Sequence, residues 1–129
     1  MNDLLWIDAE VALAVHSRLL TLEGGAFGIR DLGLLQSALA RPQQLFAYGH
    51  NPGIVDMAAA YAVGIVRDHP FIDGNKRTAL VVASLFLELN GFRFTAAEEG
   101  AAPVMLSLAA GALDEPAFTA WLRSNSVRA

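Results

Sequence analysis

The sequence predicts an all-α fold, a compact helical bundle around a buried central helix. Two long apolar runs carry this prediction, Met57–Val66 and Ala79–Leu87, because a helix that is apolar on every side belongs in the middle of a bundle. Helix-capping residues recur along the chain, and no convincing set of alternating apolar and polar residues indicates a sheet. The chain of 129 residues suits a single core, so we expect one domain over residues 1–129.

The first helix is expected over residues 8–22. Asp8 is a suitable N-cap, because its carboxylate can accept a hydrogen bond from an N–H group of the first turn. Four apolar residues recur at helical spacing and are expected to share one face: Val11, Val15, Leu19 and Leu22. His16 lies between them and is expected at the surface. Three glycines, Gly24, Gly25 and Gly28, mark the loop that follows.

A second, short helix is expected to begin after Asp31 and to run through Leu39. It should stop before Pro42, because proline disrupts the hydrogen bonding of a helix interior. Residues 43–53 contain the turn-rich stretch Tyr48-Gly-His-Asn-Pro-Gly53 and are expected to form a loop or a short hairpin.

The two apolar runs are expected to form the third and fourth helices. The third covers about 54–68 and ends near His69, because Pro70 pushes the residue before it out of the α region. The fourth begins after Gly74 and runs to about Leu89, where Asn90-Gly91 ends it.

The C-terminal part is expected to hold two more helices. Phe92–Phe94 reads as a short extended piece. Thr95-Ala-Ala-Glu98 matches a capping box for a fifth helix, which Pro103 would kink or delay. Asp114 is expected to cap a last helix that ends near Arg123.

The composition excludes several classes of protein. The chain carries 13 acidic and 9 basic residues, no cysteine, and a single lysine, Lys76. High hydrophobicity excludes intrinsic disorder, and the acidic balance without a basic run argues against direct binding of nucleic acid. The lack of cysteine excludes disulfides, thiolate metal sites and a cysteine nucleophile. The apolar runs reach about half a bilayer span, and no signal peptide is evident. We therefore expect a cytoplasmic protein that does not bind membranes.

The string His69-Pro-Phe-Ile-Asp-Gly-Asn-Lys-Arg77 concentrates the polar chemistry at the joint between the two apolar helices. The first N–H groups of a helix lack intrahelical partners and favour an anion. Gly74 permits a positive φ, which exposes successive N–H groups as a nest. Lys76 and Arg77 lie in the first turn, where the helix dipole disfavours cations. A bound polyphosphate would resolve this conflict.

The other polar residues of the string complete a group-transfer site. Asp73 is a lone carboxylate beside the expected phosphates, which is a usual way to hold Mg²⁺. His69 can accept a proton from a hydroxyl near neutral pH. Asn75 is able either to bond a phosphate oxygen or to brace the loop, and Phe71 should anchor the loop in the core. These residues predict phosphoryl or nucleotidyl transfer.

The same string resembles the signature of the Fic/Doc superfamily, HPFx[D/N]GN[G/K]R. The lysine form followed by Thr78-Ala79 resembles the death-on-curing, or Doc, branch. The resemblance covers roughly residues 3–123, because three further segments look like Doc-type sequence. These segments are Phe27–Asp31, Leu34–Pro42 and Phe86–Gly91.

The resemblance implies a toxin of a bacterial toxin–antitoxin module. Doc-type proteins use ATP to phosphorylate a hydroxyl side chain of elongation factor Tu, which stops translation. By resemblance, His69 would activate that hydroxyl and Asp73 would hold Mg²⁺. The backbone N–H groups from Gly74 onward would bind the phosphates, with Asn75, Lys76 and Arg77. The resemblance also implies inhibition by an antitoxin segment that docks in an apolar groove beside the site.

Two other functions remain open at this point. Adenylyltransferases of the superfamily usually carry glycine where this chain has Lys76, and a second arginine where it has Leu80, which argues against AMP transfer. A Doc-like binding partner without catalytic turnover is the third hypothesis. Thr95–Gly100 also matches the short motif [S/T]xxxE[G/N], by which some Fic proteins inhibit themselves, although a helix cap explains most of that match.

Two residues outside the string also have expected roles. Arg30 is expected to be structural, paired with Asp31 or another acid. His50 is a candidate for contact with the target protein, because the resemblance implies that residues 43–53 form a flap over the target segment.

Overall fold

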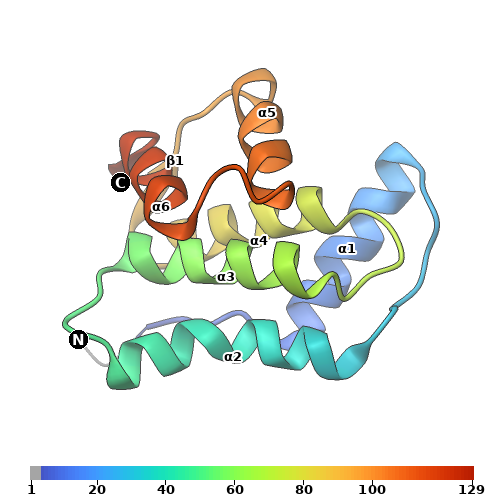
Figure 1. The fold of residues 1–129 in the computed structure, drawn as a ribbon, viewed down its shortest axis with the longest axis horizontal. Helices are drawn as coiled ribbons and strands as arrows, with labels where there is room; N and C mark the ends of the chain where they lie inside the picture. Colours follow the sequence, from blue (N-terminus) through green and yellow to red (C-terminus); the bar gives the residue numbers. More distant parts are fainter. Residues whose placement is uncertain (1–3) are drawn as a thin grey trace.

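The computed structural model describes residues 4–129 and forms a helical bundle (Figure 1). Helix makes up most of it, and the sheet found among these residues has two strands of three residues each. The predicted all-α class is therefore confirmed. None of the helices in this part of the chain is long and apolar enough to cross a membrane. The elements follow in this order: α1 (Ala9–Glu23), α2 (Leu32–Tyr48), α3 (Ile54–Asp68), α4 (Asn75–Leu89), β1 (Phe92–Phe94), α5 (Glu98–Ala109), α6 (Glu115–Ser124) and β2 (Ser126–Arg128).

Helix α3 is the buried centre of the bundle. It lies between α2 and α4, as Figure 1 shows, with α6 packed on a further side. Eleven of its 15 residues are buried, which agrees with its nearly unbroken apolar sequence. Helix α4 is less enclosed than the sequence suggested, because residues such as Leu80 and Ser84 are only partly covered. That open side of α4 becomes one wall of the candidate site.

The limits of α1 match the prediction, but its buried face does not. Asp8 is the N-cap and accepts a hydrogen bond from the backbone N–H of Val11. The buried residues are Ala12, His16 and Leu20. Leu22, expected on the buried face, is exposed. Because α1 is apolar on most sides, its sequence pattern did not identify the inward face, and the surface position predicted for His16 is wrong.

Helix α2 continues well past the predicted stop, and residues 43–53 do not form a hairpin. Pro42 lies inside the helix and is buried, and residues 43–48 are helical. The helix interior loses a hydrogen bond at proline, at a cost of about 3 kcal/mol. Close packing of α2 on α3 offsets this loss. The two helices approach so closely that a Cβ added to Gly64 of α3 would lie only 3.2 Å from the Cα of Ala38 in α2.

The joint between α3 and α4 falls where the sequence placed it. His69 ends α3 in the left-handed region at φ 52°, and Gly74 precedes α4 at φ 79°. Between them Pro70 prevents the helix from continuing. Residues 69–74 are called the α3–α4 loop below.

The C-terminal part covers the side of the bundle near α4. Strand β1 pairs antiparallel with β2, with Phe92 opposite Arg128, and β2 had not been predicted. Asp114 caps α6 as expected. Helix α5 begins after Ala97 without a side-chain cap, so the predicted capping box of Thr95 and Glu98 is wrong.

Candidate active site

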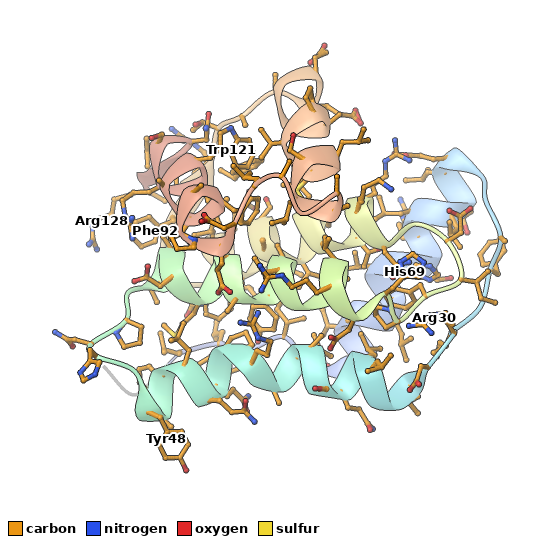
Figure 2. All side chains as sticks on the ribbon, in the orientation of Figure 1. Arg30, Tyr48, His69, Phe92, Trp121 and Arg128 are labelled. Carbon is orange, nitrogen blue, oxygen red and sulfur yellow. The ribbon has the colours of Figure 1, made fainter. Side chains whose placement is uncertain are left out.

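Arg30 holds the end of α3 and the start of the α3–α4 loop. Its Nε donates to the carbonyl oxygen of His69 over 2.6 Å, and its Nη2 donates to that of Asp68 over 2.7 Å. The side chains of Arg30 and His69 lie at the same end of the molecule in Figure 2. A cation at a helix C-terminus satisfies carbonyls that lack intrahelical partners. Arg30 is structural, as expected, but carbonyls rather than an acid are its partners.

The segment that lies along the α3–α4 loop is residues 24–31, not the expected flap at 43–53. The N–H of Arg30 donates to the carbonyl of Pro70 over 2.7 Å, and that of Ile72 donates to the carbonyl of Gly28 over 3.1 Å. Tyr48, two residues before His50, lies at the opposite end of the molecule from His69 (Figure 2). The structure thus does not bring His50 to the site.

Asn75 braces the loop from inside. Its Oδ1 accepts from the N–H of Phe71 and its Nδ2 donates to the carbonyl of the same residue, both over 2.9 Å. Asn75 is only 5% exposed and Phe71 is fully buried. Of the two roles left open for Asn75, this geometry favours the brace. Its Nδ2 also lies 3.5 Å from Nε2 of His69.

The Asp73 carboxylate is exposed and held by two backbone groups. Its Oδ2 accepts from the N–H of Ala26 over 3.2 Å, and its Oδ1 accepts from that of Gly74 over 2.8 Å. The bond from Ala26, then that from Gly74, lowers the pKa of Asp73 below its usual value, with a smaller contribution from the charge of Lys76. The carboxylate is therefore ionised at neutral pH and keeps lone pairs free for a ligand.

A magnesium ion fits this donor set. No group of three or more metal-ligating side chains occurs in residues 4–129, so a site built from protein side chains alone does not form in this part of the chain. Mg²⁺ instead prefers one or two carboxylates completed by substrate phosphates and water. A single exposed carboxylate beside a helix N-terminus meets that requirement.

Lys76 and Arg77 both project from the first turn of α4 and are exposed. Within the described chain Lys76 makes no ion pair, whereas Arg77 pairs with Glu23 at the end of α1. Glu23 thus neutralises one of the two cations that lie at the positive end of α4. The sequence did not single out this residue. Glu99, the acid of the Thr95–Gly100 motif, forms no ion pair within residues 4–129.

A cavity of about 520 Å³ opens beside these residues. Its polar end is formed by Glu23 and residues 73–77, and its apolar part runs between α4 and α5. The apolar walls include these side chains: Leu19, Leu80, Val81, Ala101, Met105 and Leu106. His69 does not line the cavity and is exposed at the other end of the loop, where a protein segment can approach it from solvent.

Comparison with known proteins identifies the family of the chain. The model of the family described as "Fic/DOC family" matches residues 6–87. The chain is 43% identical over 74 residues to "Toxin Doc" of Mycolicibacterium smegmatis. The aligned region covers 57% of this chain and 57% of the relative. It is 38% identical over 85 residues to "Protein kinase doc" of Escherichia phage P1, which covers 66% of this chain and 68% of the relative. With its signature loop between α3 and α4 inside the matched region, the chain belongs to the Fic/DOC family.

Proposed function

We propose that the chain is a toxin of a toxin–antitoxin module and a protein kinase that transfers the γ-phosphate of ATP to a Ser or Thr hydroxyl. One observation carries this proposal: Asp73, Lys76 and Arg77, at the N-terminus of α4, all line the same cavity. The names of the two relatives, a toxin and a protein kinase, agree with it.

The residues of the loop divide the work of such a transfer. His69 accepts the proton of the target hydroxyl as the hydroxyl oxygen attacks the γ-phosphorus. The bond between that phosphorus and the bridging oxygen breaks, and ADP leaves. Asp73 would hold Mg²⁺, which supplies positive charge to the phosphate oxygens. The N–H groups from Gly74 onward, with Lys76 and Arg77, stabilise the remaining negative charge. Asn75 keeps the loop in place through its bonds to Phe71.

The same proposal includes two protein partners. An antitoxin segment, docked as a helix in the apolar groove between α4 and α5, would block the cavity where Leu80, Met105 and Leu106 line it. The target protein, elongation factor Tu by resemblance, would present its hydroxyl to His69 from solvent, and both encounters would take place in the cytoplasm. Because α5 closes one side of the cavity, we assign residues 88–129 to the same domain as the rest.

Labelled ATP tests this function. Incubation with elongation factor Tu should transfer label from γ-labelled ATP and none from α-labelled ATP, and His69→Ala should abolish the transfer. Transfer of the α-label would assign AMP transfer instead. Growth arrest that survives His69→Ala, without transfer of either label, would indicate a binding partner that does not catalyse.

A further inference from the structure

We propose that His16 is a positioning residue for the active site, which orients the peptide group between Asp73 and Gly74. This inference rests on the proposed role of Asp73 as the magnesium ligand. His16 belongs to α1 and lies 57 positions before Asp73 in the sequence. It reaches the α3–α4 loop from a different helix, α1.

One hydrogen bond defines the orientation of the imidazole. Nε2 of His16 lies 2.8 Å from the carbonyl oxygen of Asp73. Because a carbonyl oxygen only accepts, Nε2 of His16 is the donor in this bond. The residue is only 5% exposed, so water does not readily replace this bond.

The same ring contacts two other residues of the loop. It stacks on Phe71 with the ring centroids 3.8 Å apart and the planes inclined by 8°. It also lies against Gly74, since a Cβ added there would be 3.7 Å from Nε2 of His16. The stack on Phe71 therefore fixes the position of the imidazole. From that position its Nε2 holds the carbonyl of Asp73.

The planarity of the peptide bond carries this effect to the site. The carbonyl of Asp73 and the N–H of Gly74 belong to one rigid peptide unit, and they point in opposite directions. When His16 binds the carbonyl on the inner side, the N–H of Gly74 must point outward. That N–H donates to Oδ1 of Asp73 over 2.8 Å. His16 thus orients the N–H group that holds the Asp73 carboxylate, which is the proposed metal ligand.

The alternative is that His16 is an ordinary core residue that contributes only packing. Two substitutions separate these roles. His16→Gln keeps an N–H donor at the end of a flexible side chain but loses the aromatic stack. His16→Phe keeps an aromatic ring on Phe71 but loses the donor. If orientation of the peptide is the function, the glutamine variant should retain it and the phenylalanine variant should not.

The first measurement needs neither metal nor nucleotide. The exchange of the Gly74 amide with solvent, measured by NMR, should be faster in His16→Phe and close to the wild-type rate in His16→Gln. The second measurement is the Mg²⁺ concentration that gives half-maximal phosphoryl transfer. Removing a residue that orients a metal ligand typically costs about 10- to 100-fold in metal affinity, so we expect an increase of that size in His16→Phe alone.

Thermal unfolding of each variant is the control, and His16→Leu, which also lacks the donor, replaces His16→Phe if that variant does not fold. Unchanged Gly74 exchange and an unchanged Mg²⁺ requirement in His16→Phe would overturn the proposal. Equal defects in His16→Gln and His16→Phe would overturn it as well, since packing would then explain both. If the wild-type chain transfers no phosphate, the proposed function fails, while the exchange comparison still decides the role of His16.

Discussion

Glu23 and Arg77 form an ion pair between the end of α1 and the first turn of α4, at the polar end of the cavity. Without a ligand, the guanidinium proposed to bind phosphate is thus occupied by a carboxylate of the same chain. Both side chains are partly exposed, Arg77 by 54% and Glu23 by 34%. Exposed pairs contribute about 0.2–1 kcal/mol, so a polyphosphate can displace Glu23 from Arg77.

Glu23→Gln should therefore strengthen binding of ATP. Removing a competing pair of this strength predicts an increase in affinity of about 1.5- to 5-fold, with little change in the free energy of unfolding. Calorimetric titration with ATP checks the affinity. Glu10→Gln is the control, because Glu10 lies on the same helix without an ion pair among the described residues. Equal affinities of both variants and wild type would show that the pair does not compete with nucleotide.

Gly25→Ala should disturb the Asp73 carboxylate. Gly25 has φ 122°, and a Cβ there would lie 2.8 Å from Oδ2 of Asp73 and 2.9 Å from Cδ2 of Leu20. Gly24→Ala is a matched control, because Gly24 also has a positive φ of 83° but nothing within 4 Å of an added Cβ. Each substitution should lower the free energy of unfolding by about 1–2 kcal/mol, because an alanine side chain disfavours a positive φ. Only Gly25→Ala should raise the Mg²⁺ requirement in a kinase titration; a similar rise in Gly24→Ala would contradict the assignment.

Asn75→Ala should destabilise the fold. It would leave the backbone N–H and carbonyl of Phe71 without their partners in a buried setting, at about 1–3 kcal/mol for each group. We expect the free energy of unfolding, measured in urea, to fall by about 2–6 kcal/mol. In Asn125→Ala, which removes one bond to the carbonyl of Trp121 at a partly exposed site, the loss should be smaller. Similar losses in the two variants would contradict the brace.

Lys76 should be needed for transfer but not for folding. Lys76→Ala removes a cation from the positive end of α4, so stability should rise by about 0.3–1 kcal/mol. The rate of phosphorylation should fall by about 100-fold or more, as when one group that stabilises transition-state charge is lost. Lys76→Gly should show the same loss of rate with about 1 kcal/mol lower stability than Lys76→Ala. Full activity of Lys76→Ala would remove this residue from the mechanism.

Local signals explain which parts of the structure could be predicted. Pro70, Gly74 and Asn90 act on the backbone within a few residues, and so the limits of α3 and α4 were correct. The same holds for the N-caps Asp8 and Asp114. The string from 69 to 77 also lies at one joint, so the sequence alone places its polar residues on one short stretch of chain, of which residues 73–77 line the cavity and His69 does not.

The predictions fail where the structure depends on packing between residues that lie far apart in the sequence. Pro42 remains helical because α2 packs closely on Gly64 of α3, and no local rule shows this. His16 and Glu23 reach the site only because α1 lies beside α4. Strand β2 has three residues and becomes a strand only by pairing with β1. The glycine pair at 24 and 25 signalled a loop but not its contact with Asp73.

The mass of the modified target protein tests the central claim most directly. Elongation factor Tu, incubated with the chain, ATP and Mg²⁺, should gain the mass of one phosphate on a Ser or Thr, as seen by intact-protein and peptide mass spectrometry. His69→Ala should leave the mass unchanged. Gain of the mass of AMP in place of phosphate would contradict phosphoryl transfer as the activity of this site.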